Sequence, residues 1–148
     1  MNVGLLITIG VVAGVVILVL VIFLIVRTAS GAMTRASGLP VLIERYRTDS
    51  PPPPNALRRQ TVAVGKVNFK NCVLLGFGDA GLYLDFGGVP IIMPRKPPIL
   101  IPWGDLRKTG ERRLFWKACS ELSIGQPTLG TITVFDDAFQ RMRPHLSA

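Results

Sequence analysis

Side chains that support common catalytic and metal chemistry are in short supply in this chain. It holds one histidine, His145, near the C-terminus, and two cysteines, Cys72 and Cys119, far apart in the sequence. A Ser-His-Asp triad or a Cys-His pair would have to recruit this lone histidine, which we expect on the solvated surface. The cysteines lack the spacing of a zinc or CxxC site, so we expect free thiols in strands, with one disulfide as the alternative in an oxidising compartment. The sequence therefore predicts no catalytic residue, no metal site and no cofactor.

Nucleotide and nucleic-acid motifs are missing as well. Gly76-Phe77-Gly78 with Gly81 superficially matches GxGxxG, but it lies at a predicted hairpin turn rather than at a strand-to-helix turn. The 17 basic residues come singly or in pairs, without a long run or a nucleic-acid motif. We expect a protein that is not an enzyme and does not bind nucleic acid. Its net charge of +8 favours an anionic membrane or an acidic protein as the partner.

Charged side chains are absent from the first 26 residues. Val3 to Val26 is an apolar run of 24 residues (26 − 3 + 1) in which Thr8 has the only hydroxyl group. At about 1.5 Å per residue such a helix reaches about 36 Å, against about 30 Å of hydrocarbon. A cleaved signal peptide has a charged start and a shorter apolar run, and the loosely cleavage-like Thr28-Ala29-Ser30 keeps it as a minority alternative. We predict that residues 1–27 are a transmembrane anchor.

Charge on the two sides of this run predicts its orientation. The α-amino group is the only charge before the run, whereas several arginines follow it: Arg27, Arg35, Arg45 and Arg47. The positive-inside rule then places the C-terminal side in the cytoplasm. Gly10 and Gly14 form a GxxxG pattern, a candidate helix–helix contact that would allow a homodimer or a larger complex. Chance, or glycine facing lipid, is the interpretation that we favour for this pair.

Residues 28–60 are predicted to be a linker. Thr28 to Gly38 is small and polar and is expected to be flexible. Leu39 to Arg47 has helical spacing of apolar residues and predicts a short amphipathic helix, docked on the domain or, as the alternative, lying at the membrane surface. Pro51 to Pro54 favours a polyproline II spacer, with an SH3-type ligand as the second interpretation.

Residues 61–148 are predicted to be a small β-rich domain. Alternating residues and turn signals indicate strands over 62–69, 72–77, 82–86, 99–107, 113–124 and 131–135, with a turn at Thr109-Gly110. Asp136 is the expected N-cap of a closing helix, Ala138 to Leu146. Trp103 and Trp116 are expected in the core. The fold class is therefore α+β: an N-terminal transmembrane helix, then an antiparallel bent sheet or partial barrel of six or seven strands with a C-terminal helix, a layout like that of PH or GRAM domains.

Three segments resemble a family of small bacterial membrane-anchored proteins. Asn71–Gly76, Gly81–Leu84 and Pro97–Trp103 are similar to the family patterns NNCLxxG, GLYL and HPPLxIPW, and Leu42 to Tyr46 loosely matches a short LAxxY segment. Two positions depart from the family, which has tryptophan at the position of Leu39 and histidine at that of Lys96. The resemblance implies the anchored architecture and a bacterial inner membrane, and it implies no activity.

The loop from Gly87 to Pro98 is the candidate contact surface. Its apolar residues stand beside two cations, a combination that suits interfacial insertion: Ile91, Ile92, Met93, Arg95 and Lys96. The alternative is that the apolar residues fold into the core. Our first hypothesis is a non-enzymatic, membrane-anchored domain that binds a partner protein or anionic lipid headgroups. The second is an accessory subunit that joins a larger membrane complex through its transmembrane helix.

Overall fold

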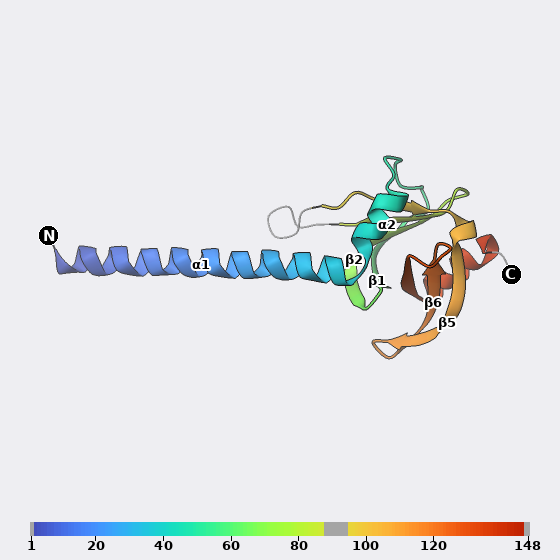
Figure 1. The fold of residues 1–148 in the computed structure, drawn as a ribbon. Helices are drawn as coiled ribbons and strands as arrows, with labels where there is room; N and C mark the ends of the chain where they lie inside the picture. Colours follow the sequence, from blue (N-terminus) through green and yellow to red (C-terminus); the bar gives the residue numbers. More distant parts are fainter. Residues whose placement is uncertain (1, 88–94, 147–148) are drawn as a thin grey trace.

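The computed structural model describes residues 2–87 and 95–146. A single long helix stands apart from a small β domain, and Figure 1 shows the helix entering the domain from one side. In chain order the elements are α1 (Val3–Ala36), α2 (Leu39–Tyr46), β1 (Leu57–Val64), β2 (Val67–Phe77), β3 (Leu82–Phe86), β4 (Ile99–Ile101), η1 (Trp103–Asp105), β5 (Leu106–Leu114), β6 (Lys117–Ile124), β7 (Gly130–Phe135), α3 (Asp136–Met142) and η2 (Arg143–His145).

Helix α1 is long and apolar enough to cross a membrane, and no other helix in the described residues is. The stretch from Val3 to Ala29 has the length and the apolar composition of a membrane span, and none of its most apolar part is buried against the domain. The helix continues to Ala36, ten residues past Val26 (36 − 26). The prediction of a flexible segment from Thr28 to Gly38 is therefore wrong over most of its length. The Thr28 hydroxyl donates to the carbonyls of Leu24 and Ile25, each at 3.0 Å, so it is satisfied within the helix.

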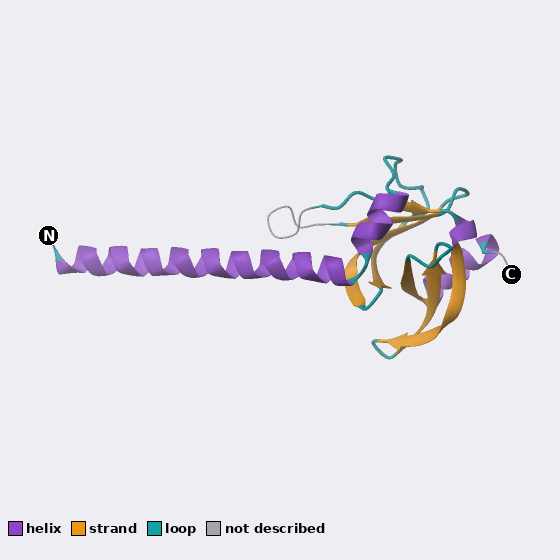
Figure 2. Cartoon of the chain, viewed as in Figure 1, coloured by secondary structure: helices purple, strands orange, loops and turns teal. Residues whose placement is uncertain are grey.

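The strands form one antiparallel sheet with the order β4-β3-β2-β1-β7-β6-β5 in the described part of the chain. The sheet curls into a half-barrel, and α3 closes it after β7 (Figure 2). Side chains from every strand meet in one core that includes Leu75, Leu84, Ile101, Leu122 and Ile132. This confirms the predicted fold class, including the number of strands and the C-terminal helix.

Helix α2 belongs to the domain rather than to a linker. Leu39, Leu42 and Tyr46 are buried in the same core as the sheet, which confirms the docked amphipathic helix. The residue after α2, Arg47, pairs with Ile99 of β4. The prediction that the globular part begins at residue 61 is therefore too late in the chain.

The proline run also packs on the domain. A methyl group added to Gly76 of β2 would collide with the ring of Pro53, so this proline lies against the sheet. Asn55 follows the run and donates from Nδ2 to the carbonyl of Phe77 at 3.0 Å. Pro53 and Asn55 thus contact the sheet, and the proline run does not hold the domain at a distance, as the spacer interpretation required.

Several predicted strand limits are wrong. The strand expected over 62–69 is two strands, because Gly65 and Lys66 form a turn between Val64 and Val67. Thr109-Gly110 does not turn the chain but lies inside β5, at a register shift against β6. Asp136 is the first residue of α3 rather than its N-cap, which is Phe135 and makes no side-chain cap hydrogen bond.

Candidate interaction sites

The predicted contact loop is described only in part. Ile91, Ile92 and Met93 lie outside the described residues, whereas Arg95 and Lys96 lie within them. Arg95 Nη2 contacts Asp85 Oδ2 at 2.8 Å, and the arginine side chain is 73% exposed. Lys96 is half-buried, and this burial lowers the pKa of its ammonium group below the usual value. The two cations therefore differ: Arg95 presents charge to solvent, and Lys96 is drawn into the domain.

A basic cavity lies beside Arg95. It has a volume of about 410 Å³, and its lining includes Arg58 and Arg59 of β1, together with Asp85 of β3. Arg59 of β1 and Asn71 of β2 both have φ of 53°, and the β1–β2 pairing shifts register on both sides of Gln60. This bulge interrupts the ladder and leaves both arginines of β1 exposed. With three guanidinium groups and one carboxylate in its lining, the cavity favours anionic ligands.

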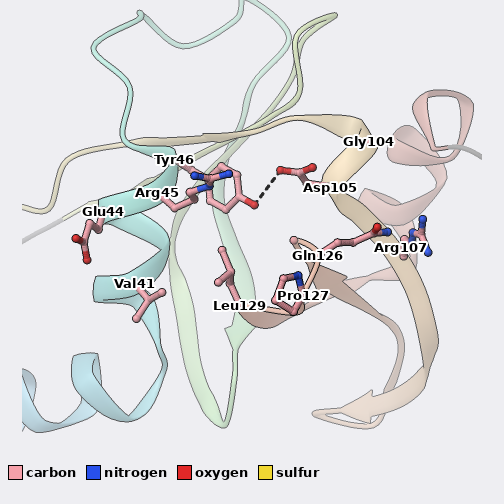
Figure 3. A pocket seen from close by; sticks show the side chains of 11 residues that line it. Val41, Glu44, Arg45, Tyr46, Gly104, Asp105, Arg107, Gln126, Pro127 and Leu129 are labelled. Carbon is pink, nitrogen blue, oxygen red and sulfur yellow. Dashed lines mark hydrogen bonds between the residues drawn. The ribbon is translucent and has the colours of Figure 1, made fainter.

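A second cavity separates α2 from the turn between β6 and β7. Its volume is about 650 Å³, and its lining comes from three segments (Figure 3), namely Val41, Glu44, Arg45, Tyr46, Gly104, Asp105, Arg107, Gly125, Gln126, Pro127 and Leu129. The Tyr46 hydroxyl donates to Asp105 Oδ2 at 2.9 Å. Burial, together with this bond, raises the pKa of Tyr46 above its ordinary value of 10.0.

The charges of this second cavity largely balance. The lining has two cations, Arg45 and Arg107, and two carboxylates, Glu44 and Asp105. Asp105 already accepts the hydrogen bond from Tyr46. With its amide oxygen turned toward Arg107, Gln126 accepts hydrogen bonds from the guanidinium, including one from Nε at 2.7 Å. The cavity thus has no surplus of one charge to select a charged ligand.

The turn between β5 and β6 is a feature that the sequence analysis missed. Trp116, which was expected in the core, is 95% exposed, and its neighbour Phe115 is 49% exposed. Both have positive φ, 50° for Phe115 and 67° for Trp116. The alternation of Leu114, Trp116 and Ala118 predicted one continuous strand, and no glycine or asparagine marks the turn.

The remaining singled-out residues serve packing. Trp103 is buried as predicted, and its Nε1 donates to the Gly78 carbonyl at 2.7 Å. The His145 ring, expected on the solvated surface, is partly buried and stacks on Trp103 with ring centres 4.7 Å apart. Cys72 and Cys119 are free thiols in strands, as predicted. No group of three or more potential metal ligands occurs among residues 2–87 and 95–146.

No family model, curated protein or solved structure matches this chain. The resemblance to small bacterial membrane-anchored proteins therefore stays a prediction. The features of the molecule that bear on its function are α1, the basic cavity and the exposed aromatic turn.

Proposed function

We propose that this protein is a non-enzymatic, single-pass membrane protein that holds its β domain at the cytoplasmic face of a bacterial inner membrane, where the domain binds the anionic lipid surface. One observation carries the proposal: α1 has no charged side chain before Arg27 and is exposed along its apolar length, whereas all 17 cations lie at Arg27 or later. An exposed apolar helix needs an apolar solvent, and a bilayer provides it.

The domain that α1 carries has a charge suited to that location. The basic cavity presents the guanidinium groups of Arg58, Arg59 and Arg95 within one lining. Anionic headgroups attract each cation near the surface by about 1 kcal/mol, so a domain tethered within reach of them accumulates this attraction. A domain free in solution would first have to give up its translational freedom, and the anchor removes that cost.

Anchoring and orientation are tested on the full chain in native membranes. We expect it to stay in the membrane pellet after alkaline carbonate extraction. In a background without the native cysteines, Ser50→Cys should react with a membrane-impermeant maleimide only after the membrane is opened. The matched control, Asn2→Cys, lies before α1 and should react in intact spheroplasts. Release by carbonate, or labelling of Ser50→Cys in intact spheroplasts, would contradict the proposal.

Lipid binding by the domain is tested by hydrogen exchange of the full chain in nanodiscs. We expect β2 and β3, which line the basic cavity, to exchange more slowly with phosphatidylglycerol than with phosphatidylcholine alone. Arg58→Glu with Arg59→Glu should remove the difference, whereas Arg141→Glu with Arg143→Glu on the α3 side should keep it. Equal exchange in the two lipids would count against the lipid surface and in favour of a partner protein.

A second candidate function is an accessory subunit assembled through α1. A methyl group added at Gly10 or Gly14 would meet nothing within 4 Å, so this face of the helix is open to a close neighbour. Crosslinking in native membranes should then give a discrete larger species that Gly10→Ile with Gly14→Ile abolishes. A chain that runs only as the monomer would rule this candidate out.

A further inference from the structure

The turn between β5 and β6 has the wrong residues for its backbone. Leu114 pairs with Lys117, so Phe115 and Trp116 alone connect the strands, and both adopt left-handed φ values. Two-residue hairpin turns with positive φ at both positions strongly prefer Asn-Gly or Asp-Gly, because a side chain in this region is strained. Two bulky aromatic residues are therefore an unfavourable choice for folding alone.

Packing inside the domain does not account for these aromatic residues either. Trp116 is almost completely exposed, and Phe115 is half-exposed. A scattered exposed apolar residue is ordinary, but a bare tryptophan beside a second aromatic residue at one protruding turn marks an interaction site. Tryptophan is the residue that most favours the boundary between hydrocarbon and water, because its ring is apolar and its N–H is polar.

Cations surround the turn. Between Arg112 and Cys119 the chain has three cations, Arg112, Arg113 and Lys117, and no carboxylate. Lys70 of β2 adds a fourth, since its Nζ lies 5.2 Å from the centre of the Phe115 ring. Glu121 offsets part of this charge through a contact with Arg112 at 3.3 Å. Two aromatic side chains with cations around them match the surface of an anionic bilayer, where apolar hydrocarbon lies beneath negatively charged headgroups.

The position of the turn in the molecule fits the same partner. Figures 1 and 2 show the β5–β6 turn at the lower edge of the domain, in the half nearer α1, whereas α3 and the C-terminus lie at the far side. If α1 lies in a bilayer, the aromatic turn is on the half of the domain that faces this bilayer. A partner protein would fit the exposed aromatic residues too, but it would not require that placement.

We infer that the Phe115-Trp116 turn inserts into the interface of an anionic bilayer, with Arg113 and Lys117 beside the headgroup phosphates. This inference rests on the proposed function, because the anchor supplies the bilayer. It goes beyond that function because it assigns the Phe115-Trp116 turn as a second membrane contact, separate from the basic cavity. Each cation near the surface should shift the ratio of inserted to water-exposed turn by about fivefold.

The test uses the full chain reconstituted in liposomes and follows tryptophan emission. With phosphatidylglycerol present, lipids brominated in their acyl chains should quench Trp116, and acrylamide should quench it poorly. Trp116→Phe leaves only the buried Trp103 and supplies the baseline to subtract. Arg113→Gln with Lys117→Gln should lower the inserted-to-exposed ratio by about fivefold per cation, whereas Arg141→Gln with Arg143→Gln should leave it unchanged.

Folding and insertion can be separated by giving the turn its preferred residues. Phe115→Asn with Trp116→Gly should keep the hairpin folded and abolish the protection of β5 and β6 from hydrogen exchange by anionic bilayers. A carbonate-resistant wild-type chain whose Trp116 stays open to acrylamide and untouched by brominated lipid overturns the inference and leaves the anchor intact. Protection of Trp116 in native membranes but not in pure lipid also overturns it, and assigns the turn to a protein.

Discussion

Two turns of one sheet follow opposite rules. The covered turn, Gly65-Lys66 between β1 and β2, takes its positive φ of 59° at a glycine, and a Cβ there would come within 2.8 Å of the Ser37 carbonyl oxygen. The bare turn, Phe115-Trp116 between β5 and β6, takes two positive φ values at aromatic residues that little covers. At the covered turn, glycine is both the residue that the backbone conformation prefers and the residue that packing requires. At the bare turn, neither backbone preference nor packing explains the aromatic residues, and we infer that a contact outside the domain does.

The largest effect is expected at the covered turn. Gly65→Val should lower the free energy of unfolding by about 3 kcal/mol, because valine is strained at positive φ and would collide with the backbone at Ser37. Urea unfolding of the full chain in detergent micelles, followed by tryptophan emission, measures this change. The control is Gly104→Ala, where an added methyl meets nothing within 4 Å. Equal unfolding midpoints for the two variants would show that the turn is not selected by packing.

A smaller loss is expected at the C-terminal end of α2, where Tyr46 contacts Asp105 of η1. Tyr46→Phe removes the hydrogen bond to Asp105 and should lower the free energy of unfolding by about 1.5 kcal/mol. Because the folded state raises the pKa of Tyr46, the contribution is complete below pH 10.0 and is lost as pH rises through the folded pKa. Stability should therefore fall less steeply above pH 10.0 in Tyr46→Phe than in the wild type.

The same pair offers an internal control. In a double-mutant cycle with Asp105→Ala, the two substitutions should be non-additive, since each removes the same bond. Additive effects together with an unchanged alkaline slope would mean that Tyr46 holds α2 by ring packing alone.

The bare turn should respond in the opposite direction. Phe115→Asn with Trp116→Gly should raise the free energy of unfolding by about 1 kcal/mol, as relief of the strained backbone exceeds the lost contact with Lys70. Urea midpoints in micelles measure it. A fall in stability would show that the aromatic residues serve the fold, and the contrast between the two turns would disappear.

The smallest effect belongs to Lys70. Lys70→Gln removes the cation over the Phe115 ring and should lower the free energy of unfolding by about 0.5 kcal/mol, the usual size at an exposed site. Lys66→Gln, in the covered turn, changes the same charge as a matched control. A loss as large for Lys66→Gln as for Lys70→Gln would make the effect one of net charge.

Much of the fold could be predicted because its signals are local. The apolar run of α1, the hairpin around Gly78 and Gly81, and the apolar spacing of α2 each lie within one short window. The antiparallel bent sheet and the closing helix followed from alternation and turn residues, but the turns that separate β1 from β2 and β5 from β6 were not predicted. The extension of α1 was missed because hydroxyl residues suggested a flexible segment, although the Thr28 hydroxyl bonds inside the helix.

The errors fall where tertiary contacts decide. Whether α2 and Pro53 pack on the domain depends on strands far away in the sequence. The bare turn escaped notice because its residues are those of a strand, and positive φ at Trp116 has no local signal. The basic cavity likewise needs β1 and β3 to be aligned across β2 before Arg58 and Asp85 can share a lining.

Helix α1 runs unbroken from Val3 to Ala36, and the core takes up Leu39 three residues later. A rod of 34 residues measures about 51 Å. If its apolar part lies in a bilayer, the thickness of the hydrocarbon sets the tilt of that part, and the rest of the helix leans by the same angle. A change in the tilt of α1 then displaces the domain at its end. Bilayer thickness, a property of the lipid rather than of any ligand, would set how near each side of the domain comes to the headgroups.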